Sequence, residues 1–158
     1  MIRPAVLEDC PAIRKIYAAA RAYMRTHGNP SQWGDTSPRE ELWQGDIRLG
    51  RLYVAEDAGQ LYGVFALVPG EDPTYRKIEG AGRDGSPYAT LHRVASDGTR
   101  HGVLNQAVEF AKTQCSHLRI DTHKDNQIMQ RAIAKNGFRY CGVILTDDGT
   151  PRLAYEWL

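Results

Sequence analysis

The sequence predicts an α/β fold in which one mixed, mostly antiparallel sheet is flanked by helices. Segments with the two-residue alternation of strands and segments with the spacing of amphipathic helices follow one another along the chain. Their order is strand, helix, helix, three strands, helix, strand, helix and two strands. Turn sequences around Gly59 and Gly149 separate strand candidates that we expect to pair as antiparallel hairpins. A length of 158 residues is typical of one domain, and we expect residues 1–158 to form it.

The first half of the chain contains three strand and two helix candidates. Residues 2–4 predict a short strand, and Asp9 is a candidate N-cap for a helix whose apolar positions are Ile13, Ile16, Tyr17 and Ala20. Residues 37–40 place Ser, Pro and Glu as in a capping box, with Ser37 at the N-cap, and predict a second helix. Residues 52–56 and 61–68 predict two strands. Residues 69–87 are rich in Gly, Pro, Asp and Arg and predict a long loop, a candidate substrate-facing element.

The second half alternates strands and helices more regularly. Residues 88–95 predict a strand, followed by a helix with an apolar stripe of Val103, Leu104, Ala107, Val108, Ala111 and Cys115. Residues 118–122 predict a strand and residues 125–136 a helix, which Gly137 ends in the C′ position. Residues 138–145 and 152–157 then predict the closing antiparallel pair.

The composition excludes several classes of protein. Lys and Arg number 20 against 19 Asp and Glu, so the net charge of +1 lacks the basic bias of a nucleic-acid binder. No apolar run approaches the roughly 20 residues that span a bilayer. The N-terminal sequence has no signal-peptide pattern, and the three cysteines are odd in number and far apart. We expect a cytoplasmic protein without a nucleic-acid or membrane partner.

The sequence DGTRHG at 97–102 predicts a binding site for a phosphate group. Glycine permits unusual backbone dihedrals, so that successive N–H groups can point at one anion, and the following helix adds its N-terminal dipole. Arg100 and His101 add positive charge. The segment is neither a Walker loop, since no Gly-Lys-Ser/Thr follows, nor a dinucleotide fingerprint, since the third glycine is absent.

Four further motifs carry a resemblance to a known family. They are DPTY at 72–75, HRVAS at 92–96, RIDTHKDN at 119–126 and NGFRYCG at 136–142. With Gly102 before one helix, and Asn126 opening another that ends in Gly137-Phe138, the chain resembles the GCN5-related N-acetyltransferase (GNAT) superfamily. It looks like the small bacterial members of unsettled substrate, and the family's element order matches along essentially the whole chain.

The resemblance implies an acetyl-CoA-dependent N-acetyltransferase that transfers acetyl directly to a primary amine of a small molecule, peptide or protein. Acetyl-CoA would lie where the strands at Leu91 and Leu118 diverge. Its pyrophosphate would meet the N–H groups of Thr99, Arg100, His101, Gly102 and Val103. Asn126 would contact the pantetheine arm, and a backbone N–H of Val94 or Ala95 would bind the oxyanion. We predict no metal, because no His, Cys, Asp or Glu set has metal-ligand spacing.

Three positions depart from the family's pattern. Thr99 stands where Gln or Arg is usual, and Leu104 where a second Gly or Ala is usual. Ile133 stands where many members carry a tyrosine that protonates the leaving thiolate. Another tyrosine (Tyr88, Tyr140 or Tyr155) could replace it, or the thiolate could leave without an acid because thiols ionise near pH 8.5. A covalent route through Cys141 is a further alternative to core packing of this residue.

Asp121 is the first candidate for the base that deprotonates the acceptor amine. It precedes Asn126 by the spacing at which some family members place a glutamate. A structural ion pair with Arg119 or with a neighbouring strand is an alternative role. His123 is the second catalytic candidate, or a solvent-exposed strand end. Trp33 and Tyr75 lie in segments that, by resemblance, border the acceptor site, and packing is their alternative role. His92 lies in the strand that would flank the acetyl group, where it could orient the substrate or be a hydrogen-bonded, half-buried histidine.

Two other functions remain open on the sequence alone. A noncatalytic acyl-CoA-binding or sensing module would share the cofactor site without the chemistry. A kinase-like or nucleotide-binding domain would use DGTRHG for a different phosphate. The oligomeric state, monomer or homodimer, depends on whether an exposed edge strand pairs with a second copy.

Overall fold

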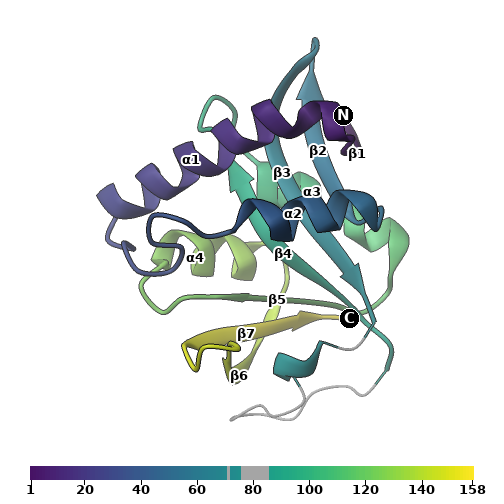
Figure 1. The fold of residues 1–158 in the computed structure, drawn as a ribbon. Coiled ribbons are helices and arrows are strands. Elements are labelled where there is room, and N and C mark those ends of the chain that lie inside the picture. Colours follow the sequence, from purple (N-terminus) through teal and green to yellow (C-terminus); the bar gives the residue numbers. More distant parts are fainter. Residues whose placement is uncertain (71, 76–85) are drawn as a thin grey trace.

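A single seven-stranded sheet with flanking helices confirms the predicted fold class (Figure 1). The computed structural model of the chain describes residues 1–70, 72–75 and 86–158. The strand order is β1-β2-β3-β4-β5-β7-β6. The strands are β1 (Ile2–Pro4), β2 (Leu52–Asp57), β3 (Gln60–Pro69), β4 (Ala89–Ser96), β5 (Leu118–Thr122), β6 (Arg139–Leu145) and β7 (Pro151–Trp157). The helices are α1 (Cys10–Thr26), α2 (Glu40–Arg48), α3 (Val103–Gln114) and α4 (Gln127–Lys135), with short 3₁₀ turns at Leu7–Asp9 and Pro73–Tyr75.

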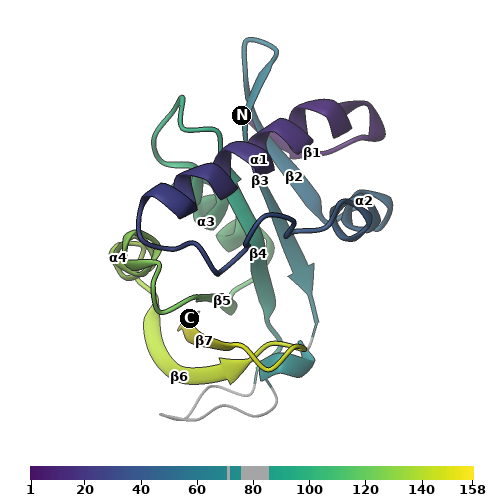
Figure 2. The same cartoon turned by 60° about the vertical axis from the view of Figure 1, so that its left-hand side comes forward.

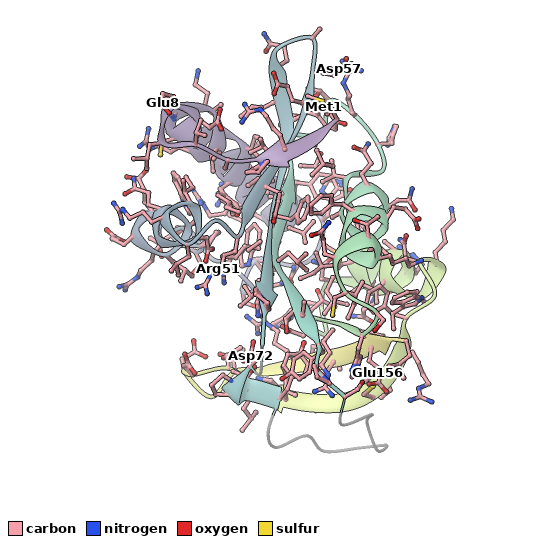
Figure 3. All side chains as sticks on the ribbon, turned by 90° about the vertical axis from the view of Figure 1, so that its right-hand side faces the viewer. Met1, Glu8, Arg51, Asp57, Asp72 and Glu156 are labelled. Atoms are coloured by element: carbon pink, nitrogen blue, oxygen red, sulfur yellow. The ribbon has the colours of Figure 1, made fainter. Side chains whose placement is uncertain are left out.

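The helices cover the two faces of the sheet in pairs. Figure 3 shows α1 and α2 on one side of the central strands and α3 on the other. The first face buries one core cluster, which includes Ile13, Trp43 and Val64. The second face buries another, which includes Phe65, Leu91 and Val108. The alternation along β3 thus divides its side chains between the two layers, as a strand covered on both faces requires.

The only parallel pair in the described sheet is β4 with β5, and it is short. The register joins Ala89 to Leu118, Thr90 to Arg119 and Leu91 to Ile120. Beyond these residues β4 pairs only with β3, and β5 only with β7. The two strands therefore separate after Leu91 and Ile120, as the resemblance implied for the cofactor site.

A β-bulge interrupts β4 just after this separation. Val64 of β3 pairs with Ala95 of β4, and Ala66 pairs with His92. One residue of β3 therefore lies opposite two residues of β4 between these pairs. Arg93, inside the bulge, has a φ of 54°, which is uncommon for a residue other than glycine.

Most predicted boundaries hold within two residues, and one cap prediction is wrong. Helix α2 begins at Glu40 with Arg39 at the N-cap, so the predicted capping box with Ser37 at the N-cap does not form. The Ser37–Pro38 peptide is cis. The predicted loop at 69–87 lies partly outside the described residues, and its described part contains the 3₁₀ turn Pro73–Tyr75. Within the described ranges, no helix is long and apolar enough to cross a membrane.

Candidate functional site

A cavity of about 840 Å³ opens where β4 and β5 separate. Its walls come from the strand ends, from the connection between α1 and α2, from the 3₁₀ turn and from the β6–β7 turn. Figure 2 shows that the α1–α2 connection passes in front of β4. The residues used below that line the cavity are Trp33, Arg39, Leu42, Asp72, His92, Arg93, Val94, Asp121, Asp148 and Arg152.

His92, Asp121 and Arg152 reach the cavity from three neighbouring strands, β4, β5 and β7. Asp121 pairs with Ala154, and Arg152 lies two residues before Ala154, on the same face. His92 pairs with Ala66, whose side chain packs in the core beneath α1 and α2. All three side chains therefore belong to the face that carries α1, α2 and their connection.

His92 and Asp72 form a hydrogen-bonded pair in the cavity wall. His92 Nε2 lies 2.8 Å from Asp72 Oδ2. Thr74 donates to Asp72 Oδ1 from its backbone N–H and from its hydroxyl. Burial raises the pKa of Asp72, but the hydrogen bonds from His92 and Thr74 outweigh it and lower this pKa to about 2. Asp72 is therefore an ionised carboxylate that orients the imidazole, the arrangement by which a carboxylate assists a histidine base.

Asp121 accepts a hydrogen bond from a buried tyrosine. Tyr75 donates its hydroxyl to Asp121 Oδ2 at 2.7 Å, and only 1% of Tyr75 is exposed. Burial and the negative charge of Asp121 raise the pKa of Tyr75 well above its usual value, so Tyr75 stays protonated as the donor. The structure shows no ion pair between the described residues Asp121 and Arg119, and the Arg119 guanidinium lies over the ring of Tyr88, 4.0 Å from its centre.

A buried carboxylate holds the β4 bulge. Asp46 of α2 is fully buried, and its two oxygens accept from Arg51 Nε and Arg93 Nε, each at 2.8 Å. The hydroxyl of Tyr17 donates to the backbone oxygen of Arg93 at 2.9 Å. These contacts fix both the side chain and the carbonyl of Arg93, and thereby the direction of the backbone at Val94, the next residue in the cavity wall.

Gln32 ties the α1–α2 connection to the end of β5. Its Oε1 accepts from Asn126 Nδ2 at 3.2 Å and from His123 N at 3.4 Å. Asn126 also caps α4, since its Oδ1 accepts from Met129 N at 3.1 Å. Both ends of the Asn126 amide are thus engaged within the protein, and Asn126 does not line the cavity.

His123 lies beside the cavity and not in its wall. Only 7% of His123 is exposed, its Nδ1 accepts from Asp125 N at 3.0 Å and its Nε2 lies 3.4 Å from Ser31 Oγ. Burial and the charge of Arg152 lower the pKa of His123, which favours the neutral ring. The prediction of an exposed strand end for this residue is wrong, because the α1–α2 connection covers it.

The predicted phosphate loop precedes α3 as expected. Gly98 and Gly102 have φ values of 84° and 85°, and the first α-helical hydrogen bond runs from Gln106 N to Gly102 O. The N–H groups of residues 103–105 therefore have no partner inside the helix. Thr99 N donates to Asp97 Oδ1 at 2.9 Å, and Arg100 pairs with Asp57 at 2.6 Å. The helix N-terminus, rather than Thr99 or Arg100, thus has the free donors for an anion.

The predicted residues fall into two groups in space. Trp33, His92, Val94 and Asp121 share the cavity, with Tyr75 directly behind Asp121. The loop from Thr99 to Val103, together with Ala95, His123 and Asn126, is not part of the cavity wall. Sequence reasoning missed Asp46, Arg93, Gln32 and Arg152, and quoted Asp72 only as part of DPTY. The local sequence carries no signal for the first four, since each acquires its role from a partner far along the chain.

Solved structures similar to this chain are acetyltransferases. Over its whole length the chain is 31% identical to an acetyltransferase of the GNAT family from Streptococcus agalactiae, covering 94% of that chain with a TM-score of 0.87. Ribosomal-protein-alanine N-acetyltransferase from Brucella melitensis is 21% identical, with a TM-score of 0.65 and coverage of 100% of this chain and 99% of that one. A putative acetyltransferase from Salmonella typhimurium, solved with its cofactor acetyl-CoA, is 17% identical, with a TM-score of 0.61 and coverage of 99% and 91%. No protein-family model and no curated protein matches the sequence.

Proposed function

Because this chain belongs to the GNAT family of acetyltransferases, we propose that it transfers the acetyl group of acetyl-CoA directly to a primary amine. The acceptor is the amine of a small molecule, or of a peptide or protein. The observation that carries this proposal is the cavity at the β4–β5 separation, because its wall combines an oriented imidazole, a carboxylate and a bulged strand. These are the groups that an attack of an amine on a thioester requires.

The acceptor amine must lose a proton before it can attack. A lysine-like amine has a pKa near 10 and is an ammonium ion at neutral pH. The Asp121 carboxyl group lies in the cavity wall, where it is suited to contact this ammonium group, and it remains our proposed base from the sequence. His92 is a second group that can take the proton, since Asp72 orients its ring within the cavity wall.

The other half of the reaction uses the backbone. We propose that a backbone N–H of the bulge, at Val94 or Ala95, donates to the oxyanion that forms on the acetyl carbonyl. The pairing of β4 with β5 ends at Leu91, so β5 does not pair with β4 at Val94 or Ala95. This supports the proposed role. The pyrophosphate would bind at the N-terminus of α3, where Gly102 keeps the approach open, since nothing lies within 4 Å of an added Cβ there.

The thiolate leaves without a dedicated acid in this proposal. Ile133 is 1% exposed and packs in the core beneath α3, so no hydroxyl is available at that position. None of the three alternative tyrosines, Tyr88, Tyr140 and Tyr155, is among the residues that line the cavity. A thiol with a pKa near 8.5 is a good enough leaving group for this route.

Thiol release from acetyl-CoA, measured with a broad panel of amines, tests the proposal. Asp121→Asn should lower kcat/KM by about 10²-fold or more, in the range expected for loss of an acid–base group. Asp35→Asn is the matched control, because the Asp35 side chain is 87% exposed and forms an ion pair with Arg25 on the surface. It should leave the rate unchanged.

The same assay separates the enzyme from a noncatalytic acyl-CoA-binding module. If CoA binds tightly and no amine stimulates thiol release, the protein is a binding or sensing module. If Asp121→Asn retains full activity on a panel amine, acetyl transfer stands and Asp121 is removed from the mechanism.

A further inference from the structure

Arg152 is a half-buried cation in the cavity wall, and it has no carboxylate partner among the described residues. Its Nη1 donates to Pro151 O at 3.2 Å and its Nη2 to Gln32 O at 3.3 Å. No carboxylate oxygen of the described residues lies within 4 Å of its guanidinium nitrogens. Burial lowers the pKa of Arg152, yet an arginine stays charged at neutral pH. The protein therefore keeps a partly desolvated positive charge beside the proposed reaction site.

Three other partly buried arginines of the described chain differ in this respect. The side chains of Arg3, Arg51 and Arg93 are at most 30% exposed, and each one reaches a carboxylate at 2.8 Å. Withdrawing a charge from water is costly unless it is paired. Two carbonyl oxygens instead orient the Arg152 guanidinium. A guanidinium has five N–H donors, so further donors are left to bind another group.

The position of Arg152 relative to Asp121 indicates what that group is. β5 and β7 are adjacent, with about 4.8 Å between neighbouring strands. Arg152 and Asp121 lie on the same face of these strands, more than 4 Å apart. Burial lowers the pKa of Arg152, and the charges of Asp121 and of Asp148, which also lines the cavity, act to raise it. A negative and a positive side chain thus stand side by side in one cavity without neutralising each other through direct contact.

This arrangement complements a small zwitterion. We propose that the acceptor is an amino acid or an amino-acid-like compound, whose amine meets Asp121 and His92 and whose carboxylate binds Arg152. The proposal deepens the acetyltransferase function and rests on it. An arginine fork matches the two oxygens of a carboxylate in a bidentate pair, which favours this oxyanion over a neutral group. Trp33 and Leu42 add apolar wall to the same cavity, which suits an apolar substituent on the acceptor.

Matched acceptors test this specificity. Thiol release is measured with leucine and phenylalanine, with the amines that lack their carboxylates (isoamylamine and phenethylamine), and with the corresponding aminophosphonates. The wild type should prefer each amino acid over its decarboxylated amine by at least tenfold in kcat/KM. Arg152→Gln should reduce this ratio by at least tenfold, mainly through KM for the amino acid, and Arg152→Lys should restore part of it.

Two control variants isolate the effect. Arg48→Gln removes an exposed arginine outside the cavity and should leave the ratio unchanged. Arg39→Gln removes the other arginine in the wall without a carboxylate partner in the described chain. If Arg39→Gln abolishes the preference and Arg152→Gln does not, the assignment of the carboxylate to Arg152 is overturned. Thermal unfolding of each variant shows whether it is folded.

The outcomes separate this proposal from the function on which it rests. Equal or faster acetylation of the decarboxylated amines would overturn the zwitterion proposal and leave acetyl transfer intact. A preference for the aminophosphonates over the amino acids would overturn the proposal that Arg152 binds a carboxylate, and would assign a phosphonate or phosphate group to this position. Absence of turnover with these acceptors, while an amine of the broad panel is acetylated, would overturn the zwitterion proposal alone. Absence of turnover with these acceptors and with the whole panel would overturn both proposals.

Discussion

At the scale of single residues, the partner of each polar side chain decides what that side chain can do. His92 is oriented by Asp72, and Asp121 by the hydroxyl of Tyr75. The two acidic groups therefore differ in their surroundings. Asp72 faces an imidazole and several donors that hold it ionised, whereas Asp121 lies in the cavity wall, where we propose that it meets the acceptor amine.

The Asp72 carboxylate should make folding depend on pH. Its pKa falls from 3.8 to about 2 in the folded protein. A lowered pKa contributes stability that is present above the unfolded value and is lost as the pH falls through the folded value. Asp72→Asn should therefore reduce the free energy of unfolding by about 2 kcal/mol near neutral pH. Urea unfolding from pH 7 to pH 2 measures this.

The difference between wild type and Asp72→Asn should shrink as the pH falls from 3.8 towards 2, where the wild-type carboxylate is protonated. Asp35→Asn, on the exposed surface, is the matched control and should change stability by less than about 1 kcal/mol at any pH. A difference for Asp72→Asn that stays constant down to pH 2 would mean that the lost stability does not come from ionisation.

At the scale of elements, two glycines before α3 shape the proposed cofactor site. Gly102 has a φ of 85°, and a Cβ added there would meet no atom within 4 Å. A side chain at this position therefore strains the backbone and fills space in front of the helix N-terminus without any clash inside the protein.

Gly102→Val should weaken CoA binding by more than its loss of folding stability explains. Gly50→Val is the matched control, because Gly50 has a φ of 70°, equally open surroundings and a place between α2 and β2, away from α3. Both variants should lose similar stability, and only Gly102→Val should lose CoA affinity in calorimetry. Equal affinities in the two folded variants would remove Gly102 from the site.

At the scale of the whole molecule, the cofactor should stabilise the fold. A ligand that binds only the native state at 100 times its Kd adds about 2.7 kcal/mol to the free energy of unfolding. For a chain of this size that corresponds to a rise in Tm of roughly 5 to 10 °C. Thermal unfolding with CoA, acetyl-CoA, ATP and NAD should show this rise for the first two ligands. Stabilisation by ATP and not by CoA would favour the nucleotide-binding alternative.

The sequence by itself determined the order of the elements, the fold class and the motifs that carry the family resemblance. Strand alternation, helical spacing and glycine turns are properties of short windows, so they could be predicted without the fold. The strand at Leu118–Thr122 was identified in this way. Asp121 and His92 were selected because they lie in such motifs.

Only the tertiary structure decided which side chains meet in one cavity. His92 acquires its partner Asp72 through a turn 20 residues away, and Arg93 binds an aspartate 47 residues away in α2. The pairing of β7 with β5 brings Arg152 to the same face of the sheet as Asp121, and the α1–α2 connection covers His123. Sheet register and helix packing set these contacts, and neither is written in the local periodicity of the chain.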